Sequence, residues 1–469
     1  TDGTISGEEA FKLYDTYGFP FELTLEYLNE LGYTVSKEEF DKYMTIQKEL
    51  AKKNAKNKTA MASQKKVLLD FHDESQFAYG IYRLKTNVLA IFSKDEIVDT
   101  VDHDCYIALK RTCFYAESGG QIYDTGFLKN DKCKAEVLDV IKAPNKQHLL
   151  HVRILSGTLK KNTEILTHVI QERREEIQKN HSSVHLLQKT LQDLLGDNVH
   201  QAGSRVDEKS FRFDFTYHGR LSDEIIMGIE EKVNEKVKAN IDTQIEYLSL
   251  EAAKKKGAMA LFEDKYGDTV RTVTMGDSIE LCGGTHVKNT KDIGKIAIIS
   301  IDNKGADTYR IEGTTTNNIN EMLHKAVEPY QKEILKILEK IKKILKEAKE
   351  NNIELNFEYN FNDAELKSFK DVIEYKEKLT ELKEKNKQIE KEYKTKKNNI
   401  STSDIKAFTT NMEVINGIKV LAAILESYDI DMIKSVADAV VNKYEDCFVL
   451  LANINNNHVN IIAKSNTDK

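Results

Sequence analysis

Two heptad-patterned stretches near the end of this 469-residue chain constrain its fold most strongly. Apolar side chains recur every three or four residues over 334–348 and again over 372–393, with Lys and Glu between them. Such seams predict two long helices that pack along one another. The break at 351–363 separates the two stretches, so we expect them to fold back as an antiparallel helical hairpin over residues 319–400.

The remaining sequence divides where its hydrophobic pattern changes. Residues 1–66 have a helical pattern that ends in a Lys- and Asn-rich linker. Residues 67–168 carry short apolar runs between Gly, Asn and Pro, which predicts a small β barrel. Residues 169–318 mix helical and strand patterns, and residues 401–469 follow the order strand, helix, strand, strand. We therefore expect an α+β multidomain fold of N-terminal helices, β barrel, α+β domain, helical hairpin and a small, partial C-terminal α/β domain.

The composition excludes several classes of protein. Hydrophobic residues make up 40% of the chain, which is too many for a disordered protein. No apolar stretch of about 18 residues occurs, so we expect no membrane span. The net charge of −7 argues against a globally basic nucleic-acid binder, although a local basic surface stays possible. The five cysteines form no disulfide framework, and a reducing, cytoplasmic setting fits them best.

Two short motifs carry candidate metal ligands. His181 and His185 are four residues apart, so both imidazoles would share one face of a helix. Cys282 and His286 have the same spacing, and the two glycines between them favour a loop. Alone, each motif has a plainer interpretation, as half-buried polar residues of a helix and as a core cysteine. Together they make a donor set of three nitrogens and one sulfur that suits Zn²⁺.

The spacing of the motifs leaves the chemistry of such a site open. The two pairs are too far apart for a zinc finger, and Ser182 stands where a zincin protease needs Glu. Four protein ligands would make a closed, structural site, whereas three ligands and a water would make a catalytic one.

Several longer segments resemble alanyl-tRNA synthetases. HSSVHLL at 181–187 and ELCGGTHVKNTKDIG at 280–294 are similar to the metal-binding signatures of that family's editing domain. Further segments resemble other parts of the family in the same order, namely 5–24, 111–126, 196–215 and 250–271. By this resemblance, residues 1–66 are the helical end of a tRNA-recognition region, 319–400 a helical arm and 401–469 the start of a C-terminal domain.

The resemblance also implies a set of site residues. The family's zinc ligands, one Zn²⁺ per editing site, are matched by His181, His185, Cys282 and His286. Gln201 matches a polar residue of the editing pocket, where an amide can orient a group but cannot act as a base. Thr112 matches a barrel threonine associated with sensing the serine hydroxyl, although an ordinary strand threonine is the plainer interpretation.

The activity that the resemblance implies is proofreading. Residues 67–168 and 169–318 would form the barrel and the zinc-binding core of an editing domain that hydrolyses mischarged Ser-tRNA(Ala) and Gly-tRNA(Ala). A pocket that fits alanine disfavours the binding of serine or glycine by only about 1–3 kcal/mol, so a second site that hydrolyses the wrong products is useful. Nothing in the chain resembles the family's synthetic core, which uses ATP and Mg²⁺ to attach alanine to tRNA(Ala), and we expect that core to precede Thr1.

Two alternatives from other classes stay open. One is a free-standing trans-editing aminoacyl-tRNA deacylase, against which the segment at 5–24 argues. The other is a non-catalytic tRNA-binding or assembly fragment with a structural zinc. The charged helical arm is either a solvated coiled coil or a spacer that also associates, so a homodimer through the C-terminal region is a further expectation.

Overall fold

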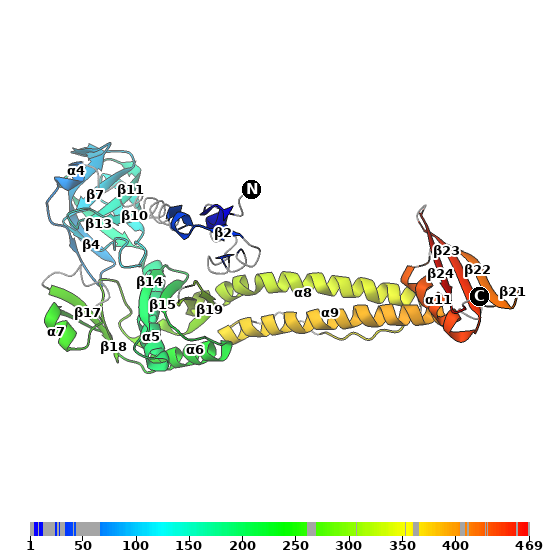
Figure 1. Ribbon diagram of the computed structural model, residues 1–469. Helices are drawn as coiled ribbons and strands as arrows, with labels where there is room; N and C mark the ends of the chain where they lie inside the picture. The colour runs from blue at the N-terminus through cyan, green and yellow to red at the C-terminus, as the bar shows by residue number, and fades with distance from the viewer. Residues whose placement is uncertain are drawn as a thin grey trace. The chain divides into compact units, whose positions relative to one another are not determined.

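The computed structural model describes most of the chain from residue 66 onward, and short stretches before it (Figure 1). The described residues are 4–7, 9–12, 24–25, 28, 33–40, 42–43, 66–259, 269–305, 307–351, 353–359, 365–403, 409, 412–426, 428, 430–455 and 458–467. They form two compact units, one of residues 1–220, 231–296 and 301–316, and one of residues 221–230, 297–300 and 317–469. The division into five segments stays a prediction.

A closed barrel of six strands confirms the β barrel expected from the short apolar runs. The strands follow the order β13-β9-β10-β11-β7-β4, and β13 pairs with β4 to close the ring. Their bounds are β4 (Arg83–Ser93), β7 (Cys105–Leu109), β9 (Gly126–Lys129), β10 (Cys133–Lys142), β11 (His148–Gly157) and β13 (Glu164–Val169). Alternate residues of these strands fill the barrel, as the two-residue period of a strand requires.

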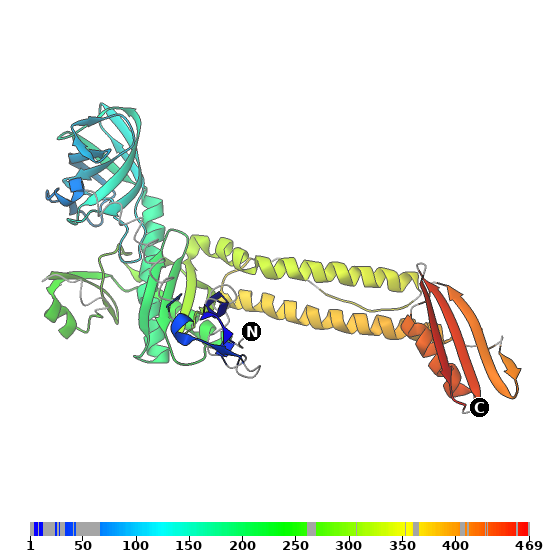
Figure 2. The same cartoon turned by 45° about the horizontal axis from the view of Figure 1, so that its top comes forward.

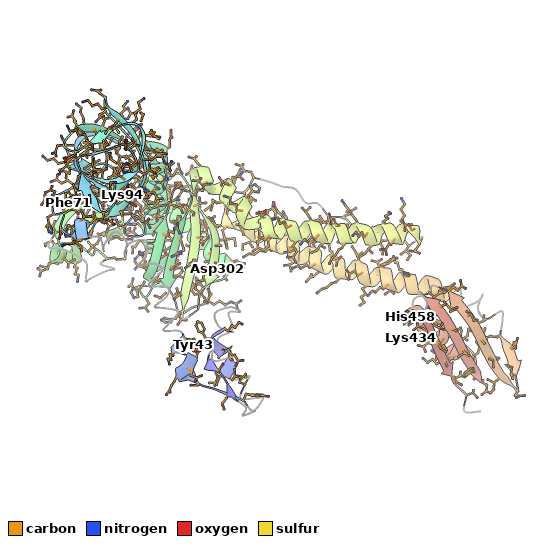
Figure 3. The ribbon with its side chains drawn as sticks, turned by 90° about the horizontal axis from the view of Figure 1, so that it is seen from above. Tyr43, Phe71, Lys94, Asp302, Lys434 and His458 are labelled. Atoms are coloured by element: carbon orange, nitrogen blue, oxygen red, sulfur yellow. The ribbon has the colours of Figure 1, made fainter. Side chains whose placement is uncertain are left out.

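Short elements surround the barrel. Phe71, which precedes the first barrel strand and is labelled in Figure 3, packs edge-on against Phe92 of β4 with ring centroids 5.2 Å apart. The remaining short elements of this region are α4 (Lys66–Leu69), β3 (Gln76–Phe77), β5 (Glu96–Val98), β6 (Thr100–Val101), β8 (Arg111–Thr112) and β12 (Leu159–Lys160).

A long helix after the barrel packs on a four-stranded sheet. Helix α5 (Gln171–Leu195) contacts three of the strands in a sheet ordered β14-β15-β20-β19. These strands are β14 (His200–Val206), β15 (Phe211–Thr216), β19 (Ile296–Asn303) and β20 (Thr308–Thr315). A second, antiparallel sheet is formed by β16 (Gln244–Ser249), β17 (Thr269–Met275) and β18 (Ser278–Leu281). The other elements of this region are α6 (Asp223–Lys238), α7 (Leu250–Lys255) and the 3₁₀ turns η2 (Thr290–Ile293) and η3 (Thr316–Asn318).

A buried ion pair joins α5 to the barrel. Arg174 and Asp124 are each about 1% exposed, and the guanidinium donates to both carboxylate oxygens. Arg174 also donates to the backbone oxygen of Cys113, and Asp124 accepts from the backbone N–H of Tyr115. Because these bonds satisfy most of the polar atoms of the pair, the charges are tolerated without water. They fix the start of α5, two turns before His181.

The two heptad stretches form long helices, but the expectation of an antiparallel hairpin is wrong. Helices α8 (Ile319–Glu350) and α9 (Phe369–Ser403) pack side by side and run in the same direction (Figures 1 and 2). Gln331 donates to the hydroxyl of Tyr375, and Asn351 donates to that of Tyr393, both at 3.3 Å. Residue numbers therefore rise together along both helices, which only a parallel pair allows.

An extended return segment makes the parallel arrangement possible. Leu366 donates its backbone N–H to Asn320 near the start of α8, so the chain has travelled back along the helix by that point. Helix α8 has 32 residues and is about 48 Å long at 1.5 Å per residue. The connection 351–368 can span about 59 Å at 3.3 Å per residue, which is long enough. In residues 353–359 the buried and half-buried side chains alternate with exposed ones, which is typical of extended chain rather than of a turn.

Burial along the two helices follows the predicted seams in most positions. On α8, Ile334, Ile341 and Ala348 are buried, while Leu338 and Leu345 are half-buried. On α9 all the predicted seam residues are buried except Asn386, which is half-buried: Val372, Tyr375, Leu379, Leu382, Ile389 and Tyr393. The start of α9 is held by the buried carboxylate of Glu230, which accepts from the backbone N–H groups of Phe369 and Ile298.

The last residues form a small α/β unit in the expected order. Its four-stranded sheet is ordered β21 (Glu413–Ile415), β22 (Ile418–Glu426), β23 (Cys447–Asn455) and β24 (His458–Ser465). Helix α11 (Ile430–Lys443) connects the parallel strands β22 and β23, as a β-α-β crossover requires. The extra strand β21 was not predicted.

Before residue 66, most of the predicted helical region lies outside the described residues. Residues 9–12 and 37–40 are helical, and Glu39 donates its backbone N–H to the Ser36 hydroxyl at 3.3 Å. A short parallel pairing of β1 (Thr4–Ile5) with β2 (Thr34–Val35) was not predicted.

No described helix is both long and apolar enough to cross a membrane.

Candidate metal centre

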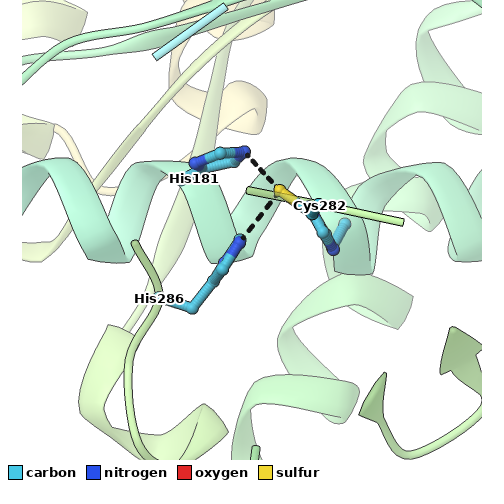
Figure 4. Close-up of side chains that lie close together, drawn as sticks. His181, Cys282 and His286 are labelled. Carbon is cyan, nitrogen blue, oxygen red and sulfur yellow. Dashed lines mark hydrogen bonds between the residues drawn. The ribbon is translucent and has the colours of Figure 1, made fainter. Parts of the chain in front are cut away.

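The four predicted metal ligands lie together in the structure, and Figure 4 shows His181, Cys282 and His286 of this group. His181 and His185 are one helical turn apart on α5, and Cys282 and His286 belong to the loop that follows β18. One candidate donor atom of each residue lies within 4.8 Å of the others. The sulfur of Cys282 is 3.6 Å from Nε2 of His181 and 3.3 Å from Nε2 of His286. Two motifs far apart in the sequence thus converge on one point.

The loop reaches α5 because Gly284 has no side chain. A Cβ at this position would lie 2.1 Å from Cε1 of His181 and 2.9 Å from Oε1 of Gln121. Both distances lie below 3.0 Å, which a real Cβ essentially never shows, so glycine lets the loop backbone approach the imidazole. The neighbouring Gly283 is different, since among the described residues a Cβ there would meet only the Tyr79 hydroxyl, at 4.0 Å.

Burial keeps the three imidazoles neutral. Desolvation, with the positive charge of Arg271 as a smaller cause, lowers the pKa of His181 to about 3. Desolvation also lowers the pKa values of His185 and His286 well below the usual value, with the neighbouring imidazoles and Arg271 as smaller causes. Neutral imidazole is the form that binds metals.

The cysteine needs a cation to ionise. Burial raises the pKa of the Cys282 thiol to about 12, and the backbone N–H of Gly284 opposes this shift with a hydrogen bond to the sulfur. A bound metal ion would supply the missing positive charge. Three buried, neutral imidazoles and the half-buried sulfur of Cys282 therefore fit Zn²⁺.

Glu280 is a neighbour of the group that sequence reasoning missed. Its Oε2 lies 3.5 Å from Nε2 of His185, while Nδ1 of His185 is buried and has no hydrogen-bond partner among the described residues. Burial raises the pKa of Glu280 to about 8. The strand β18 buries Ser278 and Glu280 and leaves Ile279 half-buried, so its polar side chains face inward, which the alternation of its sequence does not predict.

Ser182 is a second missed neighbour. Its hydroxyl oxygen accepts from the backbone N–H of Val287 at 3.1 Å and lies 3.1 Å from Nδ1 of His286. Ser182, which rules out a zincin motif, therefore contacts Nδ1 of His286. This is the ring nitrogen opposite Nε2, which faces the sulfur of Cys282. Such contacts orient ligands in metal sites.

A cavity of about 710 Å³ opens beside the group. Thr285 and His286 line one wall, and Tyr79, Arg271 and Lys288 are among its other lining residues. The guanidinium of Arg271 lies 4.2 Å from the centre of the Tyr79 ring and donates to the backbone oxygen of Cys282 at 2.6 Å. The volume suits a nucleoside-sized group, and the aromatic and cationic side chains suit a base and a phosphate.

Thr112 and Gln201 do not line this cavity. Thr112 is fully buried, and its hydroxyl oxygen accepts from the backbone N–H of Phe114 at 3.1 Å. Gln201 lies on β14 and donates to the Ser204 hydroxyl at 3.0 Å. The structure thus brings together the four metal-ligand candidates, while these two side chains are engaged with local partners.

Sequence comparisons agree with a synthetase origin. Residues 1–173 match the family model of class II (A) tRNA synthetases. Residues 270–312, which contain Cys282 and His286, match the model of the second additional domain of threonyl- and alanyl-tRNA synthetases. The barrel and the loop of Cys282 and His286 therefore lie in segments that match models built on tRNA synthetases.

The relatives define the match further. The chain is 38% identical over 464 residues to an alanine–tRNA ligase of Bacillus thuringiensis, and 38% identical over 468 residues to that of Geobacillus kaustophilus. These alignments cover 98% and 99% of the chain and 49% of each relative. The chain is thus homologous to alanine–tRNA ligases along almost its whole length, and it spans about half the length of the curated relatives it matches.

Proposed function

We propose that this chain hydrolyses the ester bond that joins a wrongly attached serine or glycine to tRNA(Ala). The observation that carries the proposal is the convergence of His181, His185, Cys282 and His286 beside a cavity of nucleoside size. The homology to alanine–tRNA ligases supplies the class of substrate. Alanine attachment, for which those relatives are named, is proposed only for a protein that also carries an ATP- and Mg²⁺-dependent synthetic core.

The cavity wall offers groups for holding the 3′ end of tRNA. The Tyr79 ring can stack on the terminal adenine, and Arg271 and Lys288 can bind its phosphate. The ester would then lie against the wall formed by Thr285 and His286. A zinc ion held by three of the four candidate ligands would have an open position, at which it would polarise an ester carbonyl or lower the pKa of a water molecule.

Thr112 is our proposal for the group that senses the serine hydroxyl, and because Thr112 is buried outside the cavity lining, the serine side chain would have to reach beyond that lining. Its oxygen accepts a hydrogen bond from Phe114, which leaves its own hydrogen free to donate. Gln201 is proposed to orient the aminoacyl group or a water molecule. Neither side chain can act as a base.

Replacement of two ligands tests the proposal. We expect Cys282→Ala combined with His185→Ala to slow deacylation of Ser-tRNA(Ala) by more than about 100-fold, because ligand contacts are worth at least this much. His103→Ala is the matched control, since this histidine is exposed and bonds to Asp102 and Ser93 on the barrel surface. An unchanged rate in the double variant would rule out the proposed centre.

A substitution of Thr112 separates serine recognition from the general reaction. We expect Thr112→Val to slow hydrolysis of Ser-tRNA(Ala) by about 10-fold, because one hydrogen bond is lost, and to leave Gly-tRNA(Ala) unaffected. Thr112→Ser should retain the serine rate. Equal slowing of both substrates would assign Thr112 to barrel packing instead.

The four-donor geometry also supports a second candidate, a tRNA-binding fragment with a structural zinc. A site with four protein ligands has no open position for water, which is typical of structural sites. In that case the double variant would unfold or lose tRNA binding, and the parent chain would bind tRNA(Ala) without hydrolysing its ester.

Self-association through residues 401–469 stays part of the proposal. The face of the sheet away from α11 carries Ile424 and Ile461, which are 74% and 67% exposed and both pair with Ala452. An exposed apolar face of this kind is typical of an interface.

A further inference from the structure

A tight turn carries a buried glutamine to the candidate metal centre. Ser118 and Gln121 exchange backbone hydrogen bonds across Gly119 and Gly120, whose φ angles are 60° and 84°. Two successive positive φ angles define a hairpin turn that glycine enters without strain. A Cβ at Gly120 would lie 2.6 Å from the backbone oxygen of Ser204, so the turn packs directly on β14. The turn therefore fixes where the fully buried Gln121 side chain points.

Contacts with Thr285 determine the orientation of the Gln121 amide. The backbone N–H of Thr285 can only donate, and it donates to Oε1 of Gln121 at 2.8 Å. Nε2 of Gln121 donates to the Thr285 hydroxyl at 2.9 Å. The opposite orientation would place an NH₂ group against a backbone N–H, so the position of the oxygen follows from the hydrogen bonds.

The amide oxygen in turn determines the tautomer of His181. Oε1 of Gln121 lies 2.8 Å from Nδ1 of His181. A carbonyl oxygen only accepts, so Nδ1 carries the hydrogen and Nε2 carries the lone pair. Nε2 is the atom that faces Cys282, 3.6 Å from its sulfur. In metal sites, a hydrogen bond to the far nitrogen of a histidine sets its tautomer and ring orientation.

We infer that Gln121 is a positioning residue for the metal centre. It holds His181 in the tautomer whose Nε2 can bind a metal ion, and it ties the loop of Cys282 and His286 to α5 through Thr285. One amide thus fixes both halves of the donor set. The inference rests on the metal site of the proposed function, but not on the reaction carried out there.

Two substitutions of Gln121 test this role through zinc affinity. Gln121→Met keeps the length of the side chain but removes the acceptor, and we expect zinc to bind about 10- to 100-fold more weakly in competition with a chromophoric chelator. Gln121→Glu keeps an acceptor for His181 and Thr285, so it should restore most of the affinity. In ¹⁵N spectra of the metal-free chain, His181 should carry its hydrogen on Nδ1 in the parent and lose this preference in Gln121→Met.

A buried glutamine elsewhere in the barrel provides the control. Gln147 is 1% exposed and donates to the backbone oxygens of Phe71 and Asp73, so Gln147→Met makes the same change of volume and polarity away from the centre. It should leave zinc affinity unchanged. Parental zinc affinity and tautomer in a folded Gln121→Met variant would overturn the inference. A parent chain that binds zinc but hydrolyses no ester would overturn the proposed function and leave the role of Gln121 intact.

Discussion

Replacing Gly284 with alanine should abolish zinc binding while the rest of the fold stays intact. The added Cβ would lie 2.1 Å from the His181 ring, so either the ring or the loop of Cys282 and His286 must move. Both movements separate the two halves of the donor set. We expect zinc affinity to fall by at least about 100-fold, the upper end of what loss of a supporting contact costs.

The neighbouring glycine is a matched control for this substitution. A Cβ at Gly283 would meet only the Tyr79 hydroxyl at 4.0 Å, which is an ordinary contact. Gly283→Ala should therefore bind zinc like the parent chain. Zinc stoichiometry after dialysis, together with the affinity from chelator competition, measures both variants. Equal zinc affinity in the two variants would contradict the arrangement of this loop.

Replacing Arg174 with methionine should destabilise the unit that contains the barrel and α5 by about 3–5 kcal/mol, because Asp124 is left buried with an unpaired charge. The loss should appear as a lower midpoint of urea unfolding. Because the pair positions the start of α5, the variant should also bind zinc less tightly through the displacement of His181.

A surface arginine serves as the control for this prediction. Arg153 is 51% exposed and lies near Glu136 and Asp104 on the barrel. Exposed pairs contribute about 0–1 kcal/mol, so Arg153→Met should leave the unfolding midpoint nearly unchanged. Similar midpoints for the two variants would mean that the Arg174 pair does not hold α5 to the barrel.

The local elements and the metal group could be predicted because each rests on a short-range pattern. The spacing of His181 and His185 on a helix decides that both face one side, whatever the rest of the fold does. The short apolar runs between turn residues, from which the barrel was predicted, are equally local. The convergence of the two motifs was predicted because three imidazoles and one thiol together suit Zn²⁺, and because both motifs resemble the metal-binding signatures of one family.

The direction of α9 could not be predicted from the seams, because a heptad pattern is the same for parallel and antiparallel pairs. The deciding information lies in the connection. Ile353, Leu355, Phe357 and Tyr359 alternate with exposed residues, a pattern that indicates extended chain long enough to return along α8. Interpreting that segment as a simple break led to the wrong topology.

The residues that contact the candidate metal ligands also could not be predicted from the sequence. Gln121, Ser182 and Glu280 are ordinary polar residues whose roles depend on contacts between distant segments. Gln121 lies 60 positions from His181 and 164 from Thr285. The Gly-Gly pair before it predicts a turn, but no pattern indicates what the turn packs against.

Zinc-dependent hydrolysis of Ser-tRNA(Ala) tests the central claim most directly. The chain would be stripped of metal with a chelator, supplied again with one equivalent of zinc, and its rate of deacylation compared at each stage. The account predicts that hydrolysis disappears with the metal and returns with it, and that Gly284→Ala stays inactive throughout. A rate that is the same with and without zinc in the folded chain would contradict it.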